Sequence, residues 1–168
     1  MLLPNFKDFK SNLESKKNQL VYKRLPADLD TAVSLMIKLT EHKKNSFLLE
    51  SVTGGEIKGR YSVIGMDPDL IWECYGQKSK IKTKVNKKFS AFKQCELNPL
   101  QALREILADI KMDIPKSLPQ MAAGLFGFLG YDMIRLVENI PNIILHKNYT
   151  IFTIIVFYIF TFIEILFH

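Results

Sequence analysis

The feature that most constrains the fold of this chain is an abrupt change in composition near Pro141. All eight glycines lie at or before Gly130, and all seven prolines lie at or before Pro141. Residues 149–167 then form a run of 19 residues, of which 15 are apolar, three are Thr and one is Glu164. Because glycine and proline mark turns, the sequence indicates an ordinary globular domain followed by a tail rich in Ile, Phe and Tyr.

The composition bounds the class of protein. Of 168 residues, 48% are hydrophobic and 24% are charged, so disorder throughout is excluded and one domain with a real core is expected. The N-terminus is too polar for a secretory signal. Cys74 and Cys95 fit no disulfide framework and no metal spacing, so a reducing compartment is the default.

Two helices are predicted from apolar residues at helical spacing. The first begins near Asp30, where Asp28 or Asp30 is expected to accept hydrogen bonds from first-turn amides, and ends near Lys43. The second runs from Asn98 to about Met112, with Asn98 as its N-cap and a proline at the first helical position.

Strands are predicted where short apolar or alternating segments lie between turns. Residues 5–20 read as a weak helix or an exposed lead-in. The expected strands are 21–25, 47–49, 60–65, 70–72, 80–85 and a glycine-spaced segment within 122–130. Helices and strands follow one another in no βαβ rhythm, so the predicted fold is α+β, strand-rich, with two or three helices.

A lysine-rich segment is the strongest charge feature. It holds seven lysines and no acid between Glu73 and Glu96. One interpretation is a surface for a phosphate backbone. The favoured interpretation is a solvated strand face that resists aggregation, because only Phe89 and Phe92 lie nearby in sequence for base stacking. No nucleic-acid partner is therefore expected.

Catalytic and metal-binding patterns are not found. The glycine-rich segment 54–60 runs into an apparent strand, whereas a phosphate-binding loop ends in Gly-Lys-Ser/Thr and enters a helix. His42, His146 and His168 have no second ligand at metal spacing. We predict no catalytic and no metal-ligating residue.

Glu50 and Ser51 end an apolar strand before a glycine-rich turn. A carboxylate and a hydroxyl at a strand end can bind an ammonium group, whereas a strand-terminal Ser more often satisfies its own turn. The residues alone leave both interpretations open.

Several segments in a fixed order resemble the N-terminal region of anthranilate synthase component I. The resemblance covers about Val21 to Glu138. It rests on Leu48-Leu49-Glu50-Ser51, Gly59-Arg60-Tyr61-Ser62-Val63-Ile64-Gly65, Asp67-Pro68, Asn98-Pro99-Leu100 and Ala123–Asp132, followed by Arg135 and Glu138.

The resemblance implies a cytoplasmic lyase of tryptophan biosynthesis. That enzyme converts chorismate to anthranilate and pyruvate with Mg²⁺, using ammonia from a glutamine amidotransferase subunit. In this family the Leu-Leu-Glu-Ser segment belongs to the feedback site for tryptophan, so Ser51, Glu50 and Leu49 are the implied ligand-binding residues, with Arg60 and Tyr61 as possible support. The sibling enzyme that makes aminodeoxychorismate is a less favoured match.

The chain departs from this family after Glu138. The chorismate and Mg²⁺ residues lie in a C-terminal part of the family that is absent here, so the chain is expected to be noncatalytic alone and to hold no cofactor. The expected division is a lead-in (1–20), the family's N-terminal domain (21–141) and an aberrant tail (142–168). A reading-frame shift in an AT-rich gene would produce such a tail.

A tail-anchored membrane protein is the rival hypothesis. As a helix, residues 149–167 would span about 28 Å, close to the thickness of the hydrocarbon layer. Glu164 would then lie near one end, where its side chain must snorkel. A strand or helix packed on the domain is the remaining alternative.

Overall fold

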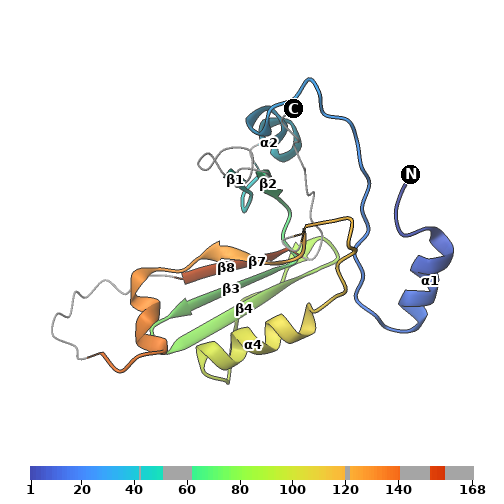
Figure 1. Cartoon of the computed structure of the whole chain (residues 1–168). Coiled ribbons are helices and arrows are strands. Elements are labelled where there is room, and N and C mark those ends of the chain that lie inside the picture. Colours follow the sequence, from blue (N-terminus) through green and yellow to red (C-terminus); the bar gives the residue numbers. More distant parts are fainter. Residues whose placement is uncertain (42, 51–61, 120–121, 141–151, 158–168) are drawn as a thin grey trace. The chain divides into compact units, whose positions relative to one another are not determined.

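The computed structural model describes residues 1–41, 43–50, 62–119, 122–140 and 152–157. Helices and strands are mixed along the chain (Figure 1), which confirms the predicted α+β class. The chain divides into two compact units. Unit 1 comprises the described residues of Met1–Pro68 and Met112–Ala123, and unit 2 comprises those of Asp69–Lys111 and Gly124–Tyr158.

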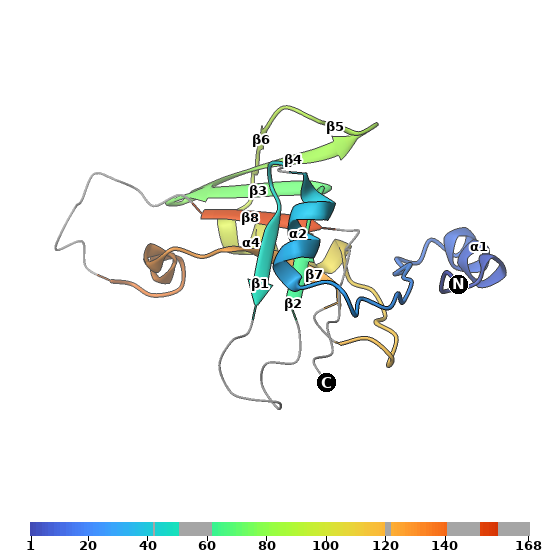
Figure 2. The ribbon, with the colours of Figure 1, turned by 90° about the horizontal axis from the view of Figure 1, so that it is seen from above.

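Unit 1 contains two helices and a two-stranded antiparallel sheet. Its elements are α1 (Phe6–Glu14), α2 (Ala32–Thr40), β1 (Phe47–Glu50) and β2 (Ser62–Gly65). Helix α2 packs against both strands, as Figure 2 shows. Helix α1 buries none of its residues, which agrees with the weak helix expected in the lead-in.

Helix α2 is capped by Thr31, so the prediction of Asp28 or Asp30 as the cap is wrong. The Thr31 hydroxyl accepts from the Ser34 N–H at 3.1 Å, and the Ser34 hydroxyl accepts from the Thr31 N–H at 3.0 Å. Asp30 lies one residue too early to reach those amides. Its carboxylate instead accepts hydrogen bonds from Lys38 and Ser34, which hold the pKa of Asp30 below its ordinary value.

Tyr22 and Arg24 connect the segment before α2 to other parts of unit 1 by hydrogen bonds. Leu3 and Tyr22 form an isolated antiparallel bridge. Residues 21–25 form no strand beyond this bridge, so the strand predicted there is wrong. The Tyr22 hydroxyl lies 3.0 Å from the Ser117 hydroxyl, and the Arg24 guanidinium donates to the Ser117 carbonyl at 2.6 Å. Residues distant in sequence are thus joined within unit 1.

Unit 2 is built on a six-stranded antiparallel sheet. The order is β5-β4-β3-β8-β7, and β6 pairs with β4. The strands are β3 (Leu70–Tyr75), β4 (Lys78–Val85), β5 (Lys88–Phe89), β6 (Lys93–Gln94), β7 (Gly124–Phe128) and β8 (Phe152–Phe157).

A two-residue turn shapes the hairpin between β4 and β5. Asn86 and Lys87 have φ of 51° and 65°. Positive φ at both central residues gives the turn whose twist matches that of paired strands. The strand predicted at 80–85 is confirmed, but its predicted apolar face is confirmed only at Ile81, which packs against the core. Thr83 and Val85 are exposed, whereas Lys80, Lys82 and Lys84 are partly buried.

Helix α4 (Pro99–Asp109) covers one face of this sheet (Figure 1). Its predicted start is confirmed: the Asn98 side chain accepts from the Gln101 N–H at 3.0 Å and donates to the Gln101 side chain at 2.7 Å. The core between helix and sheet consists of Leu70, Trp72, Cys74, Ile106 and Ile110.

Strand β8 comes from the apolar tail and lies inside the sheet. It pairs antiparallel with β3 on one side and with β7 on the other. Of the interpretations of the tail, a strand packed on the domain is the one that residues 152–157 adopt. The rest of the tail lies outside the described residues, and the boundaries 1–20, 21–141 and 142–168 stay predictions.

The 3₁₀ helix η2 (Tyr131–Leu136) follows β7 along the chain. Within the described part of the chain, no helix has the length and apolar character needed to cross a membrane.

Candidate functional site

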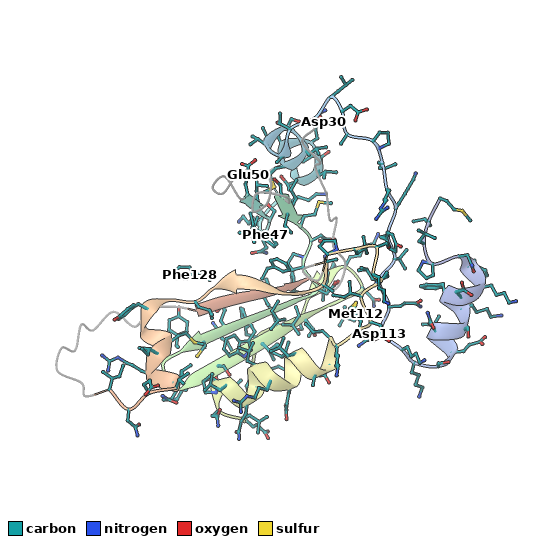
Figure 3. All side chains as sticks on the ribbon, viewed as in Figure 1. Asp30, Phe47, Glu50, Met112, Asp113 and Phe128 are labelled. Atoms are coloured by element: carbon teal, nitrogen blue, oxygen red, sulfur yellow. The ribbon has the colours of Figure 1, made fainter. Side chains whose placement is uncertain are left out.

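The candidate ligand site lies at the end of β1, where the sequence placed Leu49 and Glu50. In the antiparallel register Glu50 is opposite Ser62 and Leu49 is opposite Val63. Phe47 is opposite Gly65 at the other end of the strand. Figure 3 labels Glu50 and Phe47 at these two ends.

Strand β2 provides the fixed side of the hairpin. Ser62, Val63 and Ile64 are at most 4% exposed. Strand β1 is different, because Phe47 and Leu48 are half-buried, Leu49 is 50% exposed and Glu50 is exposed. The strand predicted at 47–49 is confirmed, but it is only half-buried, so the expectation that this apolar run is a buried strand is wrong. Among the described residues of unit 1, β2 is the sheet neighbour of β1.

Glu50 and Leu49 present a carboxylate and an accessible apolar side chain at adjacent positions. No hydrogen bond or ion pair joins the Glu50 carboxylate to another described residue. A carboxylate so placed can accept hydrogen bonds from an ammonium group, and an exposed leucine can contact an apolar ring. The other predicted site residues, Ser51, Arg60 and Tyr61, lie outside the described residues.

The lysine face of β4 includes aromatic rings that the sequence analysis did not place there. The Lys80 and Lys82 ammonium groups lie 4.3 and 4.4 Å from the centroid of the Phe92 ring. Lys82 also lies 5.1 Å from the Phe89 ring. Strands β5 and β6 return antiparallel beside β4 and bring these rings to the lysines. The available signal was the turn at Asn86 and Lys87, which predicts a hairpin.

Lys80 also pairs with Glu73, at 2.9 Å. The lysines thus neutralise a neighbouring acid and cover aromatic rings, each a modest stabilising contact at a surface. The choice between a solvated strand face and a surface for a phosphate backbone stays a prediction.

The two thiols are separate groups. Cys74 is opposite Ser79, whose carbonyl accepts from the Cys95 N–H at 2.8 Å. Cys74 and Cys95 are therefore two strands apart, roughly 10 Å at ordinary strand spacing. That exceeds the roughly 7 Å limit for a disulfide. Burial, with a smaller contribution from Cys95, raises the pKa of Cys74 to about 11.

Metal-binding groups were sought among the same residues. No three His, Cys, Asp or Glu side chains of the described residues come together in a way that would hold a metal ion. All three histidines, His42, His146 and His168, lie outside the described residues.

No family model matches the chain. Curated relatives do match it over most of its length. A protein of Cereibacter sphaeroides is 54% identical over 141 residues, which cover 84% of this chain and 28% of the relative. A protein of Acetivibrio thermocellus is 39% identical over 70% of this chain, and one of Synechocystis is 38% identical over 82%.

The chain is therefore similar to part of one family of longer proteins. All three relatives are named anthranilate synthase component 1, and the resemblance stated from sequence is confirmed. The chain spans about a quarter of the length of these relatives, since it covers 28%, 23% and 26% of them.

Proposed function

We propose that the chain forms the amino-acid-sensing N-terminal part of anthranilate synthase component 1. The observation that carries this proposal is the 54% identity to the Cereibacter sphaeroides protein over 84% of this chain. The complete enzyme would convert chorismate to anthranilate and pyruvate with Mg²⁺, taking ammonia from a glutamine amidotransferase subunit. A cytoplasmic location follows from this proposal.

Tryptophan is the proposed ligand. The exposed Glu50 carboxylate and the half-exposed Leu49 side chain support recognition of an ammonium group next to an apolar ring. Ser51 would add a hydroxyl, with Arg60 and Tyr61 as support. Because the relatives of this chain are about three times as long, much of the complete site would come from residues beyond those that match. Weak binding is therefore expected from this chain alone.

The proposal also predicts that the chain alone does not turn over chorismate. Purified chain is incubated with chorismate, Mg²⁺ and ammonia, and anthranilate is followed by its fluorescence. A time-dependent anthranilate signal that scales with the concentration of chain would overturn this part of the proposal.

Tryptophan binding is tested by calorimetry on the full chain, with phenylalanine as the comparison ligand. Glu50→Gln removes the charge and keeps the shape, so it should weaken tryptophan binding by about tenfold, as expected for a lost charged hydrogen bond. Glu96→Gln, at an exposed position of unit 2, is the matched control and should bind as the unmodified chain does. Equal binding by both variants would remove Glu50 from the site.

A further inference from the structure

Strand β4 and its neighbours in unit 2 carry the whole net positive charge of the chain. Residues 74–95 contain seven lysines and no acidic residue, whereas the formal net charge of all 168 residues is +6. The rest of the chain therefore has one more acid than base. The seven are Lys78, Lys80, Lys82, Lys84, Lys87, Lys88 and Lys93. Charge of one sign gathered in so short a segment attracts anions to it.

Three of these lysines lie in a row on one face of the sheet. Ile81 packs against the core on the side of α4, and successive residues of a strand point to opposite faces. Lys80, Lys82 and Lys84 therefore lie on the face away from α4, which is the upper face of the sheet in Figure 1. Their Cα atoms are about 7 Å apart, two residues at ordinary strand rise. We call these three residues the lysine row.

Protection of a free sheet edge does not explain the lysine row. Lysines on edge strands block unwanted pairing with other chains. Strand β4 is an interior strand, because β3 pairs with one of its edges and β5 and β6 pair with the other, as Figure 2 shows. In those pairings Lys84 is opposite Phe89 and Lys80 is opposite Gln94. The charge of the row therefore has no role in guarding an edge.

Three aromatic rings, Tyr75, Phe89 and Phe92, lie among the lysines. The Lys84 ammonium group lies 5.8 Å from the centroid of Phe89, and that of Lys80 lies 5.9 Å from the centroid of Tyr75. Phe89 and Phe92 are half-buried, and Tyr75 is 40% exposed. The sequence argued against a nucleic-acid partner because few rings lie nearby along the chain. The fold gathers these rings beside the row, so that objection loses its force.

The charges of the row are only partly balanced by acidic groups. Glu73 pairs with Lys80 at 2.9 Å, which neutralises one of the seven charges. The ammonium groups of Lys80 and Lys82 both lie within 4.4 Å of the Phe92 centroid, so two like charges are held close together. A bound phosphate beside them would offset their repulsion. The four other lysines are exposed around the row.

We propose that the lysine row, together with Phe89 and Phe92, binds single-stranded nucleic acid. Its regular spacing complements the regular anions of a phosphate backbone, and bases stack on the rings as the ammonium groups turn to the phosphates. A basic track beside aromatic rings is the arrangement used for single strands with little sequence preference. Sheet faces that carry aromatic rings bind RNA in the same way.

Two other polyanions fit this surface less well. The bases of a duplex are stacked on one another and cannot reach the rings. An acidic polypeptide would pair with the lysines and leave the rings unused. The proposal concerns unit 2 alone, whereas Glu50 and Leu49 of the candidate tryptophan site lie in unit 1.

The test is fluorescence anisotropy of the full chain with labelled oligo(U) and oligo(dT) strands of about 12 nucleotides, a length within the range of single-strand sites. The dissociation constant should be about 1–100 μM near physiological salt. The logarithm of the binding constant should fall with the logarithm of the salt concentration with a slope of about −2, because three lysines each contribute about 0.7. Tighter binding of oligo(U) or of oligo(dT) identifies RNA or DNA as the source of the strand.

Two variants separate the charges from the rings. Lys82→Gln should weaken binding and reduce the size of the salt slope by about 0.7. Phe92→Leu should weaken binding at least about fivefold and leave the slope unchanged, because it removes a stacking surface and no charge. Lys116→Gln, an equal loss of charge at an exposed position of unit 1, is the matched control and should bind as the unmodified chain does. Emission of Trp72, the one tryptophan, reports whether each variant keeps the fold of unit 2.

Two competitors test the kind of partner. A duplex of the same length should bind about tenfold more weakly than the single strand, because its bases cannot stack on the rings. A polyglutamate peptide of equal charge should also bind more weakly. Polyglutamate binding as tight as that of oligo(U) and oligo(dT) would overturn the proposal in favour of an acidic polypeptide. No binding of either strand at about 50 mM salt, or an equal effect of Lys116→Gln and Lys82→Gln on the salt slope, would also overturn it. Because Lys82 lies outside the core, this outcome stands even if Phe92→Leu disturbs the fold.

Discussion

Replacing Ser79 with alanine is expected to stabilise unit 2. The Ser79 side chain on β4 is 2% exposed, and its hydroxyl has no hydrogen-bond partner among the described residues. A buried hydroxyl without a partner costs about 1–3 kcal/mol of desolvation. Alanine removes that cost, but its lower preference for a strand reduces the free energy of unfolding by a few tenths of a kcal/mol.

The expected net gain is therefore about 1 kcal/mol. With an ordinary urea dependence of about 2 kcal/mol per molar, the unfolding midpoint should rise by about 0.5 M. Urea unfolding followed by Trp72 fluorescence is the assay, because Trp72 is fully buried in the same core. Its emission should report unit 2 with little contribution from unit 1.

Ser90→Ala is the matched control. The Ser90 hydroxyl donates to the Ala91 carbonyl at 3.1 Å and accepts from the Thr83 N–H at 3.2 Å. The same substitution there should lower stability by about 1 kcal/mol. The reasoning fails if Ser79→Ala destabilises unit 2 as much as Ser90→Ala does, since the Ser79 hydroxyl would then have a partner in solution.

Three other substitutions or measurements test the packing and the thiols. Gly65→Ala should destabilise unit 1 by about 1–3 kcal/mol, because the added methyl group overlaps the Phe47 ring. The measurement is urea unfolding followed by circular dichroism. When Phe47→Ala is already present, Gly65→Ala should cost much less. Iodoacetamide at pH 8 should label Cys95 well before Cys74, as read by mass spectrometry of the peptides. Because the pKa of Cys74 is raised to about 11 in the folded chain, its contribution to the free energy of unfolding is full below pH 9.0 and is lost between pH 9.0 and about 11. Equal labelling of the two thiols, or a free energy of unfolding that does not change over this pH range, would contradict the burial of Cys74. Phe92→Leu should cost about 1 kcal/mol, measured by Trp72 fluorescence in urea at low salt, because two ammonium groups lose the ring face; no change would mean that the ring contributes only its apolar area.

Local rules predicted the elements whose shape is decided by neighbours in sequence. Asn98 followed by proline predicted the start of α4, and the alternating lysines predicted that β4 is a strand, although only Ile81 of its predicted apolar face packs against the core. The cap of α2 is Thr31, one residue after Asp30 and three after Asp28, and it forms a capping box with Ser34 that the sequence pattern of acidic residues did not indicate.

Pairing between distant segments was not predictable from these patterns. An apolar run such as 149–167 suits a membrane helix, a packed helix or an interior strand, and β8 depends on edges contributed by β3 and β7. The same holds at the candidate site. Spacing placed Glu50 and Leu49 at a strand end, whereas the 50% exposure of Leu49 depends on tertiary packing that the spacing does not show.

The position of β8 has a consequence for how the chain is made. The last of the described strands to leave the ribosome is inserted between two strands made earlier, β3 and β7. Contacts between segments so far apart in sequence form slowly. During synthesis, the nascent chain must therefore carry two unpaired strand edges until Phe157 has emerged. Such edges are sites of aggregation, so the yield of folded protein in a cell should depend on translation speed and on chaperones that cover the edges.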